Sequence, residues 1–249
     1  MGHEIEKLAL LQGHTIAGII DSQEQWLQQS DAIASCDVII DFSVPDKAFE
    51  NINHALEAHK PIVCGATGWF HLLDEVKMLC QKKQGAVFYS PNFSLGVNLF
   101  LKINNQLARL MSQYAAYEVK IEEIHHTRKL DAPSGTAILI AEQMLENYPL
   151  KTDWSLGEAA SPTHLPVYAE RIGDVPGTHT VSYTSFCDQI VFKHEAFNRQ
   201  GFASGALAAS QWLLGKQGVF SMRDLLGDWT MLEFMRYQAK YLGWLIMDA

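Results

Sequence analysis

Residues 123–137 have the sequence EIHHTRKLDAPSGTA and begin with a cluster of ionisable side chains. His125, His126, Arg128 and Lys129 all fall in the first half of this segment. Histidine exchanges protons near neutral pH, and neighbouring cations attract negative charge. These residue types at this spacing predict proton transfer to or from an anionic ligand.

The same segment continues into a turn that is typical of a helix start. Ser134 suits the N-cap position, and the backbone N–H groups of Gly135 and Thr136 would then lack partners within the helix. Such N–H groups bind carboxylates and phosphates. An incidental pair of histidines or a plain N-cap would explain either feature alone. Because both occur in one motif, we interpret it as an active-site loop.

The composition limits the class of protein. The chain has 249 residues, 48% of them hydrophobic and 19% charged, enough for one large domain or two smaller ones. We expect no membrane span and no signal peptide, because no apolar run is long enough and the N-terminus is polar. The four cysteines show no metal-ligand spacing, which favours free thiols in the cytoplasm and no metal. The net charge of −9 argues against nucleic acid as a partner.

Strand-like and helical patterns alternate in the first part of the chain. Strands are expected at 14–20, 37–42, 61–65 and 86–90, with helices at 4–11, 48–58 and 72–82. This alternation predicts an α/β fold with a Rossmann-type parallel sheet, which binds ligands beyond the carboxyl ends of its strands. Small, polar or acidic residues dominate these ends, at Asp21, Phe42-Ser43, Gly65-Ala66-Thr67 and Ser90-Pro91-Asn92-Phe93.

The pattern changes after residue 98. The expected helices are 99–114, 135–147 and 201–214, and the expected strands are 118–126, 167–172, 178–185 and 189–197. Residues 147–166 are expected to form a loop. Because several of these strands follow one another without intervening helices, they predict an antiparallel or mixed sheet in a second, α+β domain.

Taken together, the motifs resemble the dihydrodipicolinate reductase family, NAD(P)H-dependent enzymes of bacterial lysine and diaminopimelate synthesis. The resemblance extends from residue 1 to about residue 228. Besides segment 123–137, it rests on DFSVPDKA (41–48), CGATGW (64–69), SPNFSLGVN (90–98), RIGDVPGTHTV (171–181) and HEAFNRQGFASGAL (194–207).

The resemblance implies a domain plan and a reaction. Residues 1–94, completed by 215–249, would form the dinucleotide-binding domain. Residues 95–214 would form the substrate-binding and oligomerisation domain, typically of a homotetramer. The reaction would reduce the dicarboxylate 4-hydroxy-tetrahydrodipicolinate to tetrahydrodipicolinate, with hydride from NADH or NADPH entering the ring as water leaves.

The resemblance also implies the roles of individual residues. His125 would be the acid/base residue and Lys129 the proton donor, whereas Arg128 is expected to be a solvated or structural charge. The residues that hold the carboxylates of the substrate would be His126, Ser134, Gly135 and Thr136. The cofactor-binding residues would be Gly2, Asp21, Phe42, Ser43, Gly65, Ala66, Thr67, Ser90, Asn92 and Phe93.

The choice of cofactor can be addressed through charge. Asp21 at the end of an expected strand would accept hydrogen bonds from the adenosine ribose, although a simple turn aspartate is the alternative interpretation. No lysine or arginine occurs between Lys7 and Lys47 to pair with a 2′-phosphate. We therefore expect NADH to serve at least as well as NADPH.

Two features depart from the family pattern. The family's first strand and most of its glycine-rich loop have no counterpart before Gly2, which leads us to expect a misassigned start or a truncation and weakened dinucleotide binding. A tail from residue 230 extends past the family's usual end, and it carries apolar residues at helical spacing that are expected to pack in a core or interface. These are Met231, Phe234, Met235, Tyr241, Leu242 and Leu245.

Two other functions stay open at this point. A related oxidoreductase with the same two-domain plan, such as an aspartate or homoserine dehydrogenase, is disfavoured by the HHTRK and PSGT motifs. A protein that binds small dicarboxylates without a cofactor would follow if the chain truly starts at Met1. Titration with a nicotinamide dinucleotide separates an enzyme from such a binder.

Overall fold

The computed structural model describes residues 1–227, which divide into two compact units. One unit contains Ala9–Pro91 and the described residues from Ala206 on, and the other contains Asn92–Gly205 with most of the first eight residues. In this part of the chain, no helix is both long and apolar enough to cross a membrane. The apolar tail expected after residue 230 lies outside the described residues.

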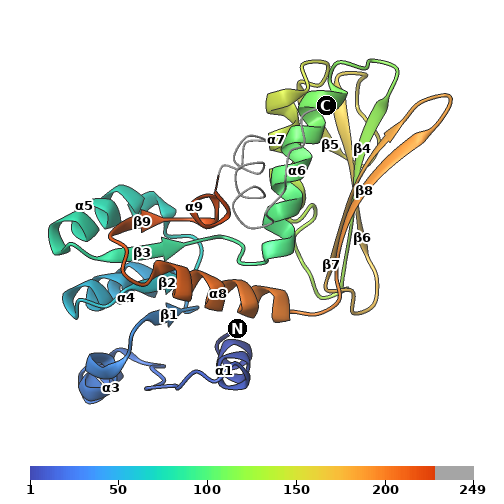
Figure 1. The fold of residues 1–249 in the computed structure, drawn as a ribbon. Coiled ribbons are helices and arrows are strands. Elements are labelled where there is room, and N and C mark those ends of the chain that lie inside the picture. The colour runs from blue at the N-terminus through green and yellow to red at the C-terminus, as the bar shows by residue number, and fades with distance from the viewer. Residues whose placement is uncertain (228–249) are drawn as a thin grey trace, which may run out of the picture. The chain divides into compact units, whose positions relative to one another are not determined.

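The first unit contains a parallel sheet of four strands (Figure 1). In spatial order these are β1 (Ile39–Asp41), β2 (Ile62–Cys64), β3 (Ala86–Tyr89) and β9 (Gly218–Phe220). The register aligns Asp41 with Cys64 and Cys64 with Tyr89, so the carboxyl ends of β1, β2 and β3 meet at one edge. This sheet confirms the predicted Rossmann-type class.

Helices cover both faces of the sheet. On one face, Ile52 of α4 and Val76 of α5 join Val87 of β3 in a buried apolar cluster. Because side chains alternate along a strand, Phe88 points to the opposite face, where its ring lies 5.9 Å from that of Trp212 on α8. The helices with residues in this unit are α2 (Gln23–Gln28), α3 (Ser30–Ser35), α4 (Pro45–Glu57), η1 (Phe70–Leu72), α5 (Leu73–Lys83), α8 (Gln200–Leu213) and α9 (Met222–Leu226). Most of α1 (Gly2–Leu11) belongs to the second unit.

The prediction of a strand at residues 14–20 is wrong. These residues form no strand, and most of their side chains are exposed. A strand is stabilised by ladder hydrogen bonds to a neighbour. Within the described residues β1 is an edge strand that pairs only with β2, and residues 14–20 do not pair with its free edge, so they lack the ladder hydrogen bonds of a strand.

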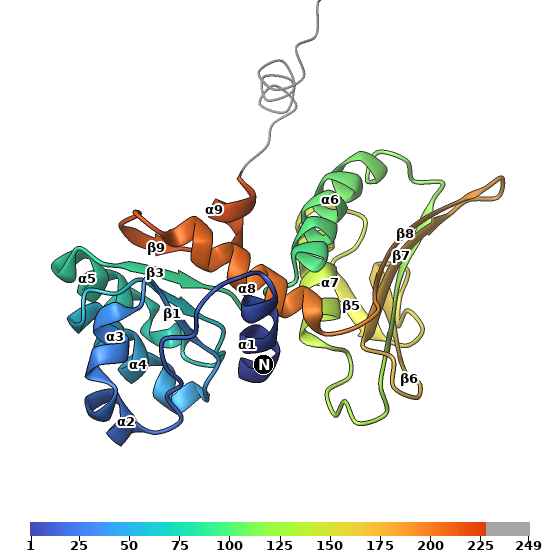
Figure 2. The same cartoon turned by 60° about the horizontal axis from the view of Figure 1, so that its bottom comes forward.

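The second unit contains a mixed sheet, one of the two arrangements that the sequence predicts, and the sheet has five strands where four were expected. Its order is β5 (Asp153–Leu156), β6 (His164–Arg171), β4 (Glu118–His125), β7 (Gly177–Thr184) and β8 (Gln189–Ala196). β4 is central, parallel to β6 and antiparallel to β7. Helices α6 (Leu95–Met111) and α7 (Gly135–Asn147) lie against the same face of this sheet (Figure 2), where Phe100, Ile121 and Ile140 share one buried core.

The loop expected at 147–166 is only partly a loop. β5 forms there and pairs in parallel with β6, which itself begins earlier than expected, at His164. The sequence of β5, DWSL, is neither strictly alternating nor strongly apolar, and both of its end residues are exposed. Its strand conformation depends on pairing with β6, which is a non-local contact.

Candidate functional site

The alternation of β4 brings two ionisable side chains to the face that carries the core. Val119 and Ile121 point into the core, and with the strand period of two Glu123 and His125 follow on the same face. Glu123 is 0% exposed and His125 8% exposed. His179 lies directly opposite Glu123 on the antiparallel strand β7, which places its side chain beside the other two.

Glu123 is surrounded by hydrogen-bond donors. Its carboxylate accepts hydrogen bonds from the backbone N–H of Ser134 at 2.9 Å, from the Ser134 hydroxyl, and from Nη2 of Arg171 at 3.1 Å. Burial alone would raise the pKa of Glu123, but the contacts with His125, Ser134 and Arg171 outweigh it and lower the pKa to about 2. The carboxylate is therefore ionised at neutral pH.

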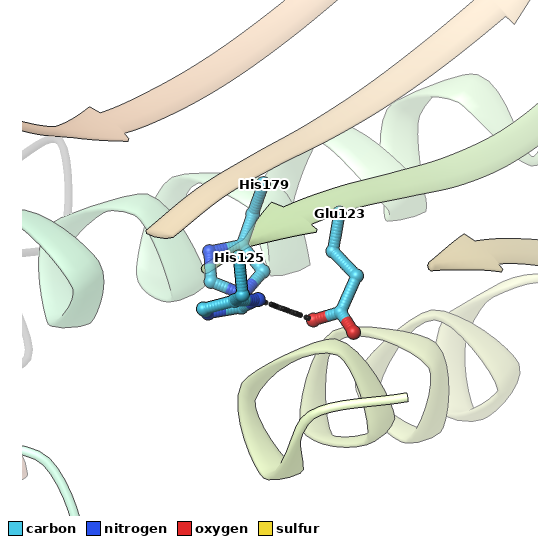
Figure 3. Close-up of side chains that lie close together, drawn as sticks. All are labelled: Glu123, His125 and His179. Carbon is cyan, nitrogen blue, oxygen red and sulfur yellow. Dashed lines mark ion pairs between the residues drawn. The ribbon is translucent and has the colours of Figure 1, made fainter. Parts of the chain in front are cut away.

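His125 is held between Glu123 and the start of β7. Its Nδ1 lies 3.2 Å from Oε2 of Glu123 (Figure 3). On the other side of the ring, a Cβ atom at position 177 would lie 3.0 Å from Nε2, so Gly177 leaves the space that the imidazole occupies. The sequence predicts an ionisable His125 here, and the structure places it in a buried, defined orientation.

His179 is a neutral neighbour of this pair. Its Nε2 lies 3.4 Å from Oγ of Ser134 and 3.7 Å from Oε2 of Glu123, and its ring stacks edge-on against His125 at 5.2 Å. Burial, reinforced by the nearby His125, lowers the pKa of His179 to about 4. At neutral pH this histidine therefore carries no charge.

Glu123, His125 and His179 lie close enough together to be considered as ligands of one metal ion, because a potential ligand atom of each lies within 4.8 Å of the others. However, the guanidinium of Arg171 already lies 3.1 Å from Glu123 and balances its charge. A second cation beside this ion pair would be repelled. We therefore interpret the group as a network that orients side chains.

Arg171 also fixes the loop that contains Lys129. Its Nε donates to the Lys129 carbonyl oxygen at 3.3 Å, and Nη2 donates to the Asp131 carbonyl oxygen. The Lys129 ammonium lies 2.8 Å from the Asp131 carboxylate, and the side chain of Lys129 is 24% exposed. The predicted cation is thus near the surface of the site, on a loop whose backbone is tied to Glu123 through Arg171.

The other two ionisable residues of the motif differ in their surroundings. Partial burial lowers the pKa of His126, and the positive charges of Arg128 and Arg199 lower it further. Arg128 is exposed and pairs with Asp174 at 2.7 Å, which agrees with the expectation of a solvated charge.

The start of α7 has the form that the sequence predicts. Ser134 is the N-cap, and its hydroxyl accepts a hydrogen bond from the N–H of Ala137 at 3.2 Å. Gly135 and Thr136 open the helix, and no hydrogen bond within the described residues occupies their N–H groups. Gly135 is exposed and Thr136 half-buried. Ser134 itself is 2% exposed, so its hydroxyl serves the cap and Glu123.

Several of the predicted cofactor-binding residues meet at the carboxyl edge of the parallel sheet. A Cβ atom at Gly65 would lie 2.3 Å from the ring of Phe42, so the backbone after β2 passes directly over this ring. Ser43 follows Phe42, and its N–H donates to Oδ1 of the buried Asp41 at 2.9 Å. At this edge Thr67 is exposed, whereas Ala66 and Ser90 are buried.

The segment with Asp21 is tied to this edge through Asn51, a buried residue of α4. Asn51 donates to Oγ of Ser43 at 3.1 Å and accepts from the side chain of Gln23 at 3.3 Å. Asp21 is exposed, and its N–H donates to the side chain of Gln25. Among the remaining predicted residues, Gly2 opens α1, and Asn92 and Phe93 fall in the second unit, where Asn92 accepts from the N–H of Ser94 at 2.9 Å.

Comparison with known protein families identifies the family of this chain. Residues 1–93 match the family described as dihydrodipicolinate reductase, N-terminus, and residues 96–226 match dihydrodipicolinate reductase, C-terminus. The chain belongs to the dihydrodipicolinate reductase family. The predicted resemblance is thereby confirmed.

Individual relatives of this reductase family agree. The chain is 43% identical to the 4-hydroxy-tetrahydrodipicolinate reductase of Christiangramia forsetii, over 92% of this chain and 94% of that protein. It is 35% identical to the enzyme of the same name from Wolinella succinogenes, over 78% of each chain. A dipicolinate-bound dihydrodipicolinate reductase from Paenisporosarcina sp. TG-14 shares the fold, with a TM-score of 0.63 and 24% identity over 81% of this chain and 76% of that chain.

The sequence predicts no role for four residues of the site, which are Glu123, Arg171, His179 and Asn51. The first three occur in motifs that resemble the reductase family, but no local pattern gives them a role. One available signal is the alternation of β4, because the period that buries Val119 and Ile121 also points Glu123 inward. The meeting of Glu123 with Arg171 and His179 depends on strand pairing across the sheet.

Proposed function

We propose that this chain reduces 4-hydroxy-tetrahydrodipicolinate to tetrahydrodipicolinate with NADH or NADPH and loss of water, in lysine and diaminopimelate biosynthesis. The observation that carries the proposal is the arrangement around Glu123. This buried carboxylate contacts His125, the cap of α7 and, through Arg171, the Lys129 loop. The family membership and the names of the curated relatives support the same reaction.

The carboxylates of the substrate bind at the start of α7 and to the neighbouring cations. The free N–H groups of Gly135 and Thr136 point out of the helix N-terminus, where backbone dipoles favour negative charge. Lys129 and His126 lie on the adjoining loop. Because the Lys129 ammonium already pairs with Asp131 at 2.8 Å, a substrate carboxylate competes with this aspartate for it.

His125 and Lys129 manage the protons of the reaction. Loss of a hydroxyl group as water requires a proton at the departing oxygen, and an acid held within reach lowers the barrier to that step. His125 supplies the acid/base function because its ring is fixed on one side by Glu123. Lys129 supplies a proton or a positive charge from the exposed side of the site.

The carboxyl edge of the parallel sheet fits a dinucleotide. A bound reduced nicotinamide supplies a hydride. A Cβ atom at position 65 would clash with the ring of Phe42, so only glycine lets the backbone after β2 pass this close to the ring. Phe42, Ser43, Gly65, Ala66, Thr67 and Ser90 line this edge, and Asp21 accepts from the ribose.

In this proposal the unit with the parallel sheet binds the dinucleotide, and the unit with the mixed sheet binds the substrate and forms a homotetramer. Support for the second role comes from apolar side chains exposed on and near the β7–β8 hairpin. Val191 is 52% exposed and Phe186 fully so. Mass measurement in solution tests the oligomeric state.

The direct test is a steady-state assay with freshly formed 4-hydroxy-tetrahydrodipicolinate and either nicotinamide dinucleotide. We expect oxidation of the cofactor that depends on substrate and enzyme, with tetrahydrodipicolinate identified by mass spectrometry. A chain that binds the stable dicarboxylate dipicolinate but oxidises no cofactor would instead be a dicarboxylate-binding protein.

A further inference from the structure

Glu123 takes no direct part in the reaction proposed above, yet it is the most completely buried charged side chain of the site. Its carboxylate contacts four donor groups from three elements: the N–H and O–H of Ser134 before α7, Nη2 of Arg171 on β6, and Nδ1 of His125 on β4. No acceptor competes among these contacts. A buried charge so fully matched by donors indicates a defined role.

Each contact fixes a different part of the site. Ser134 is the N-cap of α7, so its two hydrogen bonds to Glu123 set where the free N–H groups of Gly135 and Thr136 lie. Arg171 binds Glu123 and two carbonyl oxygens of the loop that carries Lys129. One carboxylate therefore connects the anion-binding helix end with the cationic loop.

The third contact favours one of the two neutral forms of His125. Nδ1 is shielded from solvent and has no partner that meets hydrogen-bond geometry, but Oε2 of Glu123 lies 3.2 Å away, within ion-pair distance. A proton on Nδ1 faces this carboxylate, whereas a lone pair there would be repelled by it, so the contact favours the Nδ1–H form and leaves Nε2 to exchange protons with a ligand. The neighbouring His179 is neutral and does not compete as a cation for the carboxylate.

We propose that Glu123 is a positioning residue that holds the Nδ1–H tautomer of His125 and aligns it with the start of α7 and the Lys129 loop. This inference rests on the proposed reductase function, because only the reaction makes the tautomer matter for catalysis. The general logic is that of a buried carboxylate that orients a catalytic imidazole.

Glu123→Gln is the informative substitution. It keeps the size of the side chain but replaces one acceptor oxygen with an NH₂ donor, so at least one of the four donors must lose its partner. Glu122→Gln is the matched control. Glu122 is the preceding residue of the same strand, faces the opposite side, and pairs with Lys120 near the surface at 3.0 Å.

Two measurements on the full-length chain report the effect of Glu123→Gln, one on the tautomer of His125 and one on catalysis. Nitrogen-15 NMR of labelled histidines, with His125 assigned through the spectrum of His125→Gln, reports the tautomer without any substrate. We expect the Nδ1–H tautomer in the wild-type protein and in Glu122→Gln, and a mixture in Glu123→Gln. Kinetics should show kcat lowered by about 10²-fold or more in Glu123→Gln, with the KM for NADH unchanged and that for the dicarboxylate raised.

The outcomes separate the two proposals. An inactive wild-type protein would contradict the proposed function, whatever the tautomer. An active wild-type protein with His125 in the Nε2–H form would overturn the positioning role, even if Glu123→Gln does not fold. Equal kcat values for wild type, Glu122→Gln and Glu123→Gln would overturn it as well. A parallel loss of affinity for NADH would indicate general damage to the fold and also count against it.

Discussion

The hydroxyl of Ser134 joins helix α7 to strand β4, because it accepts a hydrogen bond from the N–H of Ala137 and donates one to Glu123. A serine N-cap needs only the first of these contacts. The second ties the end of the helix to a buried carboxylate that also contacts His125. The proposed anion-binding and proton-transfer parts of the site are thus connected through Glu123.

The acid/base assignment predicts large losses of turnover. His125→Ala and Lys129→Ala should each lower kcat by about 10²-fold or more, because each removes a positioned proton-transfer group or charge. Arg128→Ala is the control, since Arg128 is exposed and paired with Asp174. Steady-state kinetics of the three variants tests the acid/base assignment. Turnover near the wild-type rate in both His125→Ala and Lys129→Ala would exclude these roles.

The start of α7 predicts an effect confined to the substrate. Thr136→Pro removes one backbone N–H in the first turn, where proline is compatible with a helix. The KM for the dicarboxylate should rise by about tenfold, the effect of losing a hydrogen bond to a charged group, while the KM for NADH stays unchanged.

Thr136→Ala keeps the N–H and removes only the hydroxyl, so it serves as the matched control. Its substrate KM should stay close to that of the wild-type protein. Equal increases in Thr136→Ala and Thr136→Pro would assign the effect to the hydroxyl and contradict binding by the backbone.

The charges near Asp21 predict the choice of cofactor. Lys47 pairs with Glu50 at 3.0 Å, and Lys60 donates to the carbonyl oxygens of Ala34 and Cys36, so neither is free for a 2′-phosphate. We expect kcat/KM for NADH to equal or exceed that for NADPH. Asp21→Arg should shift the ratio toward NADPH by supplying a cation. A strong preference of the unmodified chain for NADPH would disagree with this prediction.

The buried histidine His179 predicts how stability depends on pH. Burial lowers the pKa of His179 from 6.5 to about 4 in the folded protein. Between these values the unfolded chain binds a proton that the folded chain excludes, so the free energy of unfolding rises with pH across this window. The contribution of this group is at most about 3 kcal/mol. The lowered pKa of Glu123 acts in the same direction at lower pH.

Urea unfolding of His179→Gln between pH 4 and 7 tests this. The variant should show a weaker pH dependence than the wild-type protein, whereas His71→Gln, at an exposed position, should retain the wild-type slope. Identical slopes for wild type and His179→Gln would show that His179 is protonated as easily in the folded chain as in the unfolded one.

The predictable parts of the fold are the helices and strands that local sequence patterns determine. Helix α7 has the bounds that the Pro-Ser-Gly-Thr turn and the following apolar residues predict. β4 follows its alternation of buried and exposed residues. In contrast, residues 14–20 are as apolar as a strand but form none, and β5 is a strand without an apolar pattern. Both outcomes depend on whether the segment pairs with another strand, which no local window of sequence shows.

The same distinction applies to the site. His125, Lys129 and Ser134 share one continuous motif, and the structure connects them through two residues, Glu123 and Arg171. Arg171 reaches Glu123 from β6, which pairs with β4 although the two strands are far apart in the sequence. A sequence motif can therefore name candidates for the reacting groups, whereas the groups that contact them from other strands become visible only once the strands are paired.

The most direct test of the proposed reduction follows the transferred hydrogen. NADH deuterated at the transferable position of its nicotinamide, mixed with 4-hydroxy-tetrahydrodipicolinate and the enzyme in a single turnover, should give tetrahydrodipicolinate that contains a single deuterium. The rate should be lowered by about 10²-fold or more in His125→Ala. Product without deuterium, or oxidation of NADH without formation of tetrahydrodipicolinate, would contradict the account.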